Sequence, residues 1–173
     1  ISYFFGFYLN ENSSGGALQD FKIHWQTLSY FEESYINSLN NYEKLGNTHS
    51  PVYIIFLELL NIKNNMFYLR FVYIFICILL PFYFYKCLRL KFPLIDKKIL
   101  FYLSLFFFLS PYFRSLAYWP GDENLGLIFF TISIFYFLKF NKKENKETKY
   151  LILNIFFLAC SAYIRPIYCL FSI

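Results

Sequence analysis

Long apolar stretches separated by short polar segments dominate the chain, and this pattern predicts membrane-spanning helices. A span needs about 20 mostly apolar residues, and stretches of roughly that length cover 66–85, 99–118, 124–140 and 150–170. Residues 1–9 are expected to be the end of an earlier span, because the chain opens within an apolar run. We therefore predict an all-α, multi-pass transmembrane helical bundle of about five spans, with no separate soluble domain.

Both ends of the chain fall within apolar runs. The first residue is Ile1 rather than Met, and the last run continues to Ile173. We expect residues 1–173 to be a fragment of a longer protein, namely the N-terminal part of a transmembrane domain.

Charge is distributed unevenly between the predicted loops. Ten of the 16 basic residues lie in two segments, 86–98 and 139–149. Basic loops stay in the cytoplasm, and two spans separate these two, so one orientation suits both. Residues 10–65 then form a large loop outside the cytoplasm, which carries most of the acidic side chains. In a bacterium the chain would lie in the plasma (inner) membrane.

Composition agrees with a membrane location. The chain is 58% apolar and only 16% charged, whereas soluble domains average about 25% charged residues. The net charge of +5 does not indicate a nucleic-acid partner, because the basic residues cluster in the loops between spans. The expected partners are membrane lipids. The four cysteines lack the CxxC spacing of a zinc or redox site.

The outer loop is predicted to contain two helices at the membrane surface. From Ala17 to about Tyr35, apolar residues recur every three or four positions, which is typical of an amphipathic helix. Residues 51–62 are apolar but too short to span, and Pro51 suits a helix start. An interfacial helix is expected there.

The first of these helices offers candidate chemistry. Asp20 and His24 are four positions apart, so a helix brings them to neighbouring places on its surface. Asp20 lies near the positive N-terminal end, which favours its ionised form. Such a carboxylate could act as a general base or help to hold a divalent metal. A solvated polar face of an interfacial helix is the alternative.

Three stretches resemble the integral-membrane GT-C glycosyltransferases, particularly bacterial relatives of protein mannosyltransferases and aminoarabinose transferases. They are ENSSGGALQDFKIHW (11–25), THSPVYIIFLELLNIKNNMFYLRF (48–71) and SPYFRSLAYWPGDENLGLIFF (110–130). The resemblance covers nearly the whole chain. It implies a GT-C-like bundle in which the large outer loop follows the first span.

The resemblance implies an activity and assigns roles to residues. Such enzymes transfer a sugar, with inversion, from a polyprenyl-phosphate donor to a glycan, lipid or protein acceptor outside the cytoplasm. An acidic residue of the first outer loop serves as base or orients the acceptor, so Asp20 is the first candidate and Glu11 the second. The family often has a tight acidic pair here, whereas nine positions separate these two. His24 would support the acceptor side.

Cations at the outer boundary would stabilise the phosphate leaving group. Arg114 and Arg165 are the candidates, with His49 as a further donor-phosphate contact. Snorkelling to the interface is the alternative for both arginines. Arg70, near the outer end of the second predicted span, is expected to be an interfacial anchor.

Asp122 and Glu123 follow Pro120-Gly121 and open the fourth predicted span. They could hold a divalent metal such as Mg²⁺ or Mn²⁺. Alternatively, they cap the helix and offset its dipole.

Three other classes of protein remain open. A transporter or flippase of lipid-linked saccharides would need helices broken in mid-span and charges at membrane depth. A polysaccharide polymerase would carry its major outer loop elsewhere. A non-catalytic scaffold would have no use for Asp20 beside His24.

The predicted orientation can be tested by cysteine labelling. A thiol introduced by Lys142→Cys should react with a membrane-impermeant reagent only from the cytoplasmic side, since residues 139–149 form a basic loop. Labelling from the outer side would overturn the orientation.

Overall fold

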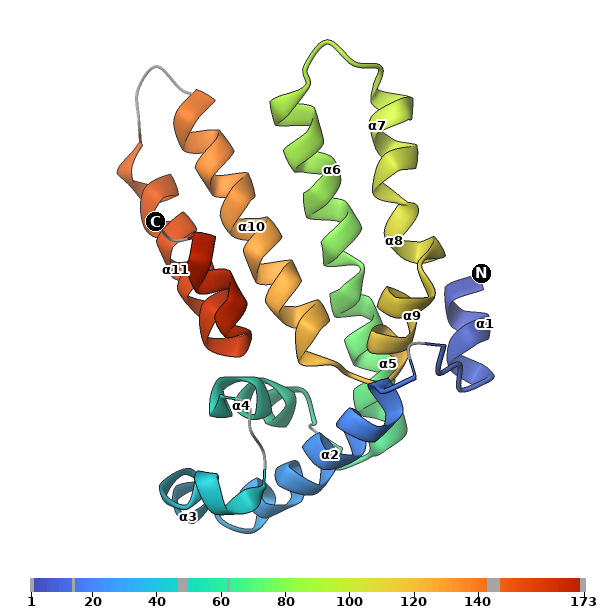
Figure 1. The fold of residues 1–173 in the computed structure, drawn as a ribbon, viewed down its shortest axis with the longest axis vertical. Helices are drawn as coiled ribbons and strands as arrows, with labels where there is room; N and C mark the ends of the chain where they lie inside the picture. The colour runs from blue at the N-terminus through green and yellow to red at the C-terminus, as the bar shows by residue number, and fades with distance from the viewer. Residues whose placement is uncertain (1, 14, 47–49, 62, 143–146, 172–173) are drawn as a thin grey trace.

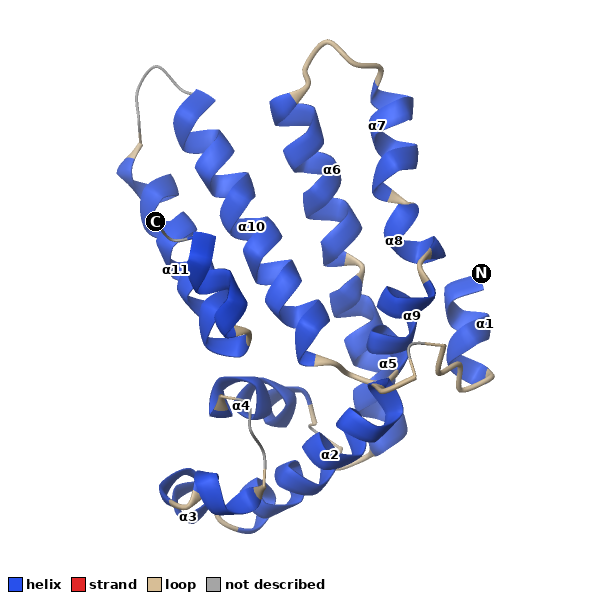
Figure 2. Cartoon of the chain, in the orientation of Figure 1, coloured by secondary structure: helices blue, strands red, loops and turns tan. Residues whose placement is uncertain are grey.

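The computed structural model describes residues 2–13, 15–46, 50–61, 63–142 and 147–171. Over these residues every regular element is a helix and there is no strand (Figure 2). The all-α prediction is therefore confirmed.

Two helices are long and apolar enough to cross a membrane. One runs over Met66–Lys91, in which α5 (Met66–Cys77) continues into α6 (Leu79–Lys91), and the other is α10 (Asp122–Lys142). A third candidate joins Lys97–Leu109 to α9 (Pro111–Tyr118) with a bend of 63°. The structure therefore supports a membrane protein with two or three helices of this kind.

The bend lies at a proline, inside the stretch 99–118 that was predicted as a single span. Helices α7 (Lys97–Ser104) and α8 (Phe106–Leu109) lead to Ser110, whose backbone is extended at φ −71° and ψ 120°. Pro111 then opens α9 as its first residue. A residue before proline is disfavoured in the helical region, which accounts for the change of direction.

The first predicted segment, 1–9, contains a helix as expected, whereas the helix in the last predicted span is shorter than expected. Helix α1 covers Ser2–Tyr8, and α11 covers Thr148–Ile164, which is 17 residues. The prediction that the last span continues to residue 170 is wrong, because Arg165 is extended at φ −133° and ψ 103°. Pro166 disfavours a helical backbone at Arg165, as Pro111 does at Ser110. The 3₁₀ helix η2 (Pro166–Phe171) then turns back beside α11 (Figure 1).

The helices give the molecule two chemically different ends (Figure 1). The end of α6, the start of α7, the end of α10 and the start of α11 lie at one end, which is where the basic segment 86–98 and the basic residues Lys139, Lys142 and Lys149 are. At the opposite end lie α2 (Ala17–Glu33), α3 (Tyr35–Asn40), η1 (Tyr42–Leu45) and α4 (Pro51–Leu60). We call this second end the loop end of the bundle.

Both predicted loop helices are present. Helix α2 begins at Ala17 as expected, and α4 begins at Pro51, where the Ser50 hydroxyl accepts a hydrogen bond from the Val52 amide. Proline is well suited to this first position because its missing N–H would have no helical partner.

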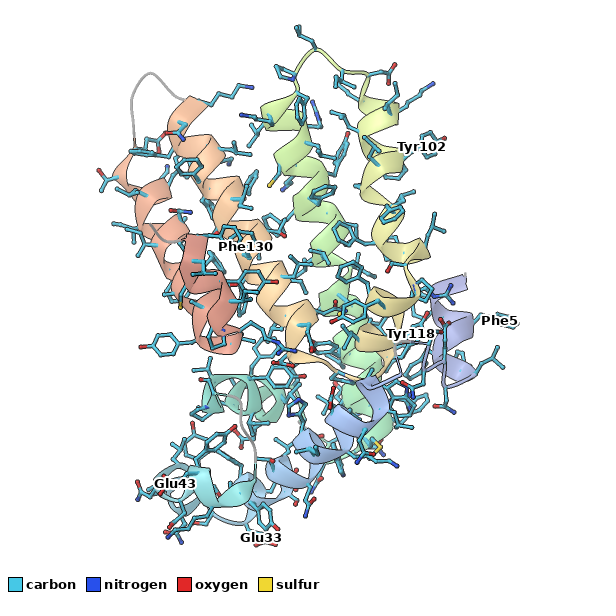
Figure 3. The ribbon with its side chains drawn as sticks, in the orientation of Figure 1. Phe5, Glu33, Glu43, Tyr102, Tyr118 and Phe130 are labelled. Carbon is cyan, nitrogen blue, oxygen red and sulfur yellow. The ribbon has the colours of Figure 1, made fainter. Side chains whose placement is uncertain are left out.

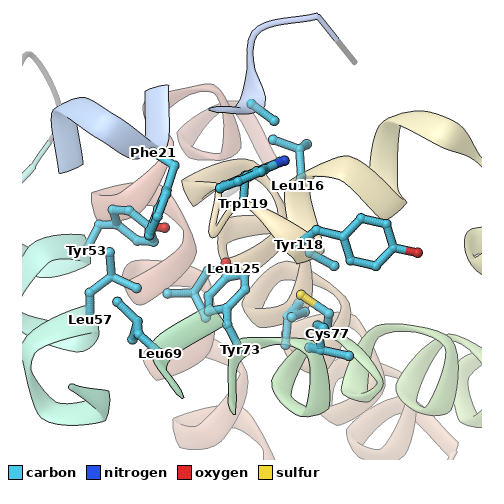
Figure 4. Packing of buried hydrophobic residues seen from close by; sticks show 14 of the residues in the cluster. Phe21, Tyr53, Leu57, Leu69, Tyr73, Cys77, Leu116, Tyr118, Trp119 and Leu125 are labelled. Carbon is cyan, nitrogen blue, oxygen red and sulfur yellow. The ribbon is translucent and has the colours of Figure 1, made fainter. Parts of the chain in front are cut away.

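The buried core lies at the loop end, where α2, α4, α5, α9 and α10 meet (Figure 4). Tyr53, Tyr73 and Tyr118 are fully buried there. By contrast, α7, α8 and α11 expose large apolar side chains, including Tyr102, Phe106 and Ile152 (Figure 3). Exposed apolar surface of this extent is unusual in soluble proteins and suits contact with lipid.

Candidate functional site

An ion pair between Glu11 and Arg114 joins the loop after α1 to α9, across 103 positions of the chain. The Arg114 Nε atom also donates a 3.2 Å hydrogen bond to the Tyr118 hydroxyl, one turn further along α9. The Ser13 hydroxyl donates to the second carboxylate oxygen of Glu11 at 2.8 Å. Both charged side chains keep 21% of their surface exposed, so a ligand can reach them.

The pair lies directly against α1, and this closeness depends on Gly6. A Cβ atom at Gly6 would lie 2.5 Å from Glu11 Oε2 and 2.6 Å from the Tyr118 hydroxyl. Both distances are shorter than real Cβ contacts, so a side chain at position 6 would push the ends of the Glu11 and Tyr118 side chains from these positions. We call Glu11, Arg114 and Tyr118 the Glu11 site.

A buried arginine, Arg70, forms hydrogen bonds on both sides of the Glu11 site, one to a backbone carbonyl and one to a side chain. The Arg70 side chain is only 7% exposed. Its Nε donates to the Tyr118 carbonyl at 2.7 Å, and its Nη2 donates to Asn10 Oδ1 at 3.0 Å. Its guanidinium carbon lies 3.6 Å from the centroid of the Trp119 ring and 5.0 Å from that of Phe7. The charge is therefore held by hydrogen bonds and by aromatic faces.

The prediction that Arg70 is an interfacial anchor is wrong, since its guanidinium points into the protein. The contacts form because the loop and α9 both bring an acceptor to the start of α5. Asn10 adopts the left-handed conformation at φ 52°, and the Trp119 indole nitrogen donates to the Glu11 carbonyl at 3.0 Å. Arg70 and Trp119 together fix the position of Glu11.

A second ionic cluster surrounds Arg165, at the end of α11. Its Nε lies 2.8 Å from Asp122 Oδ2, and its Nη2 forms an ion pair with Glu123. The Asp122 side chain is only 2% exposed, whereas Glu123 and Arg165 remain partly exposed. One guanidinium thus ties the C-terminal end of α11 to the first turn of α10.

Close packing of α10 against α11 brings Arg165 to this place. The Ser161 hydroxyl donates to the Gly126 carbonyl at 2.7 Å. A Cβ atom at Gly126 would lie 3.2 Å from Arg165 Cγ and 3.1 Å from the Tyr168 ring. The glycine therefore leaves room for both side chains.

A pocket of about 350 Å³ opens beside this cluster. Its lining consists of three consecutive residues of η2, Pro166, Ile167 and Tyr168, together with Tyr112, Glu123 and Arg165. We call it the Arg165 pocket.

Asp20 and His24 do not present a carboxylate and an imidazole side by side. Asp20 is exposed in the first turn of α2, whereas His24 is only 1% exposed and packs edge-on against Tyr53 with ring centroids 4.9 Å apart. His24 falls on the buried face with Phe21 and Leu28. The boundary of that face runs between positions 20 and 24, because four residues advance somewhat more than one helical turn.

Burial also changes the acidity of two phenols at the loop end. The pKa of Tyr42 is raised to about 12, first by burial and then by the negative charge of Asp122. The same two causes raise the pKa of Tyr53 well above its usual value. Both hydroxyls therefore stay protonated at neutral pH.

At the predicted metal site, Asp122 and Glu123 both pair with the Arg165 guanidinium, which occupies the position expected for a metal ion. Among the residues that the structure describes, no three His, Cys, Asp or Glu side chains gather as a metal site would require. His49, predicted to contact the donor phosphate, lies outside the described residues.

Several residues of these two sites were missed from the sequence. Tyr112 and Tyr168 carry no charge or motif, and nothing in the chain pattern distinguishes them from the other tyrosines. Arg70 could have been found, because a charged residue within an apolar helix is costly to bury and suggests a functional role.

The fold and the two sites define an all-helical protein with helices of membrane-spanning length and a polar, ion-paired end. No known protein family, curated protein or solved structure matches the chain.

We expect Arg70→Lys to lower the free energy of unfolding in detergent by about 1–3 kcal/mol, because a lysine cannot replace the forked hydrogen bonds to the buried Tyr118 carbonyl and to Asn10 Oδ1. Lys86→Gln is the matched control. That lysine lies in the same long helix, 4.2 Å from the Phe82 ring centroid, and its loss should cost less than about 0.5 kcal/mol. Equal losses of unfolding free energy in the two variants would contradict the role of Arg70 in joining the loop after α1 to α9.

Proposed function

We propose that this chain belongs to a membrane glycosyltransferase. The enzyme would move a sugar from a polyprenyl-phosphate donor to an acceptor on the extracytoplasmic side of the membrane. The proposal includes a GT-C-like bundle, with about five spans in this part of the chain and with the loop end facing outward.

The observation that carries the proposal is the Glu11–Arg114 ion pair at the loop end of an apolar bundle. Transfer from a lipid phosphate needs a carboxylate to accept a proton and a cation to stabilise the departing phosphate. Both groups are present here, partly exposed and held by their own neighbours. The surrounding apolar helices would hold the phosphate of a lipid-linked donor at the same depth in the membrane as the Glu11–Arg114 pair.

The reaction would proceed by inverting displacement. The acceptor hydroxyl oxygen forms a bond to the anomeric carbon, and the bond from that carbon to the phosphate oxygen breaks with its electron pair left on the phosphate. The hydroxyl proton passes to the Glu11 carboxylate, while the Arg114 guanidinium stabilises the new negative charge. A donor phosphate that pairs with Arg114 would release Glu11 to act as the base.

Glu11 has more geometric support as the base than Asp20. Glu11 shares its site with the candidate phosphate ligand Arg114, whereas Asp20 is exposed and His24 is turned into the core. We therefore propose Glu11 ahead of Asp20, the reverse of the order expected from the chain pattern.

Arg165 has less support as a phosphate ligand than Arg114. Two carboxylates already pair with its guanidinium, and an anion entering there would be repelled by both of them. A Mg²⁺ or Mn²⁺ ion between Asp122 and Glu123 would have to displace the same guanidinium. Neither role is needed for the reaction proposed at Glu11.

A transporter or flippase of lipid-linked saccharides is the second candidate, and one observation favours it. The helix pair Lys97–Leu109 and Pro111–Tyr118 is bent by 63°, and broken helices are a feature of transporters. Movement of a labelled lipid-linked saccharide between leaflets, in vesicles that contain the protein and without any sugar transfer, would favour this candidate.

The base can be identified by measuring sugar transfer from a polyprenyl-phosphate donor in membranes. We expect Glu11→Gln to reduce the rate by about 100-fold or more, the usual range for loss of a general base, and Asp20→Asn to leave it within about twofold. The reverse result would make Asp20 the base. Full activity in both variants would remove the loop carboxylates from the reaction.

Binding of the donor can be measured separately from transfer. Arg114→Ala should weaken the affinity for the polyprenyl-phosphate donor by about tenfold or more, as expected for loss of a charge-assisted hydrogen bond. Lys63→Ala removes a cation that lies near the Tyr68 ring instead, and should leave the affinity unchanged. Unchanged affinity in the Arg114 variant would leave that residue only its structural role.

A further inference from the structure

We propose that the Arg165 pocket binds an uncharged sugar ring, at a place remote from the bond that the Glu11 site makes. The inference rests on the proposed transferase function and adds a second carbohydrate contact to it.

The walls of the pocket are aromatic, and one of them is held rigidly. Tyr168 stacks on Phe130 with ring centroids 4.8 Å apart and an angle of 22° between the planes. Phe130 is also packed against Phe171, at 5.0 Å. Tyr112 provides a second ring from α9, and it is 47% exposed. The C–H bonds on the face of a pyranose ring pack favourably against such π surfaces, which carry partial negative charge.

The polar groups of the pocket suit a pair of neighbouring hydroxyls. The ion pairs occupy Nε and Nη2 of Arg165 and Oε1 of Glu123. Nη1 of Arg165 can still donate a hydrogen bond, and Oε2 of Glu123 can still accept one. A sugar diol can accept the first bond and donate the second. Because the buried Asp122 holds Arg165 from behind, the guanidinium is already oriented before a ligand arrives.

Charge separates this pocket from the Glu11 site. The Arg165 guanidinium is paired with two carboxylates, those of Asp122 and Glu123, so an anion that enters the Arg165 pocket meets these carboxylates as well as the cation. At the Glu11 site the Glu11–Arg114 pair is neutral, and the nearby Arg70 adds a positive charge. A phosphate or a uronate is therefore repelled from the Arg165 pocket, whereas a neutral sugar is not.

The size and place of the pocket fit one sugar unit of a longer ligand. Its volume of about 350 Å³ is at the small end of ligand pockets. Tyr112 and Arg114 are two positions apart on α9, and such residues face different sides of a helix. In Figure 1, α1 and α11 likewise lie on opposite sides of α9 and α10. The bound ring would therefore sit about one helix diameter, roughly 10 Å, from Arg114.

Saturation-transfer NMR on the full chain in lipid nanodiscs tests this inference, with methyl α-D-glucopyranoside and glucuronate as probes and inorganic phosphate as a competitor. The neutral glycoside should receive saturation, and it should bind more tightly than glucuronate at this site. Tyr168→Ala and Tyr112→Ala should each weaken glycoside binding by about three- to tenfold, as expected for loss of an aromatic contact.

Two controls accompany these variants. Tyr168→Phe keeps the ring and should keep the binding. Tyr163→Ala removes a tyrosine of α11 that is 66% exposed and should have no effect. Thermal unfolding of each variant shows whether it is folded, and the exposed position of Tyr112 keeps the test valid if Tyr168→Ala does not fold.

Each result bears on one proposal. No saturation of the glycoside, unchanged binding in both alanine variants, tighter binding of glucuronate, or displacement of the glycoside by phosphate would overturn the sugar site. Glycoside binding at Tyr168 without any transfer from a lipid-linked donor would leave the site standing and reject the transferase. Transfer without binding at Tyr168 would reject the site alone.

Discussion

A positive charge buried at the start of the long helix Met66–Lys91 shapes the loop end of the bundle. A guanidinium removed from water is costly unless its N–H groups find acceptors. Arg70 finds them in the Tyr118 carbonyl and in Asn10, and it packs on the Trp119 ring. Because these acceptors come from the loop after α1 and from the end of α9, satisfying one side chain fixes three segments together. The Glu11–Arg114 pair lies between the segments that Arg70 joins.

Small residues and prolines make this arrangement possible. Gly6 lets Glu11 and Tyr118 lie against α1, and Gly126 lets Arg165 lie against α10. Pro111 turns α9 away from the axis of α7 and α8, and Pro166 stops α11 so that Arg165 meets the first turn of α10. The result is two ionic clusters on either side of α9 and α10. One pairs a single carboxylate with an arginine and has a second arginine, Arg70, close by, whereas the other sets two carboxylates against one arginine.

Local structure could be predicted from the chain pattern, because it depends on neighbours in sequence. The helices beginning at Ala17 and Pro51 follow from apolar spacing and from proline at the first turn. Pro166 was also visible in the sequence, and its effect on Arg165 should have shortened the span predicted to reach residue 170. Contacts between distant segments could not be predicted. Arg70 meets a carbonyl 48 positions away, and His24 is buried because α4 covers that side of α2 with Tyr53.

Amide hydrogen exchange of Arg70→Lys tests most directly whether Arg70 holds the Glu11 site together. In the unchanged protein the Asn10 and Glu11 amides donate to Phe7 and Gly6 carbonyls, so they should exchange slowly. We expect the variant to exchange faster over residues 7–13 and 115–121, while α10 beyond its first turns keeps its protection. Unchanged exchange in these two segments, or an equal increase along the whole chain, would contradict the role of Arg70.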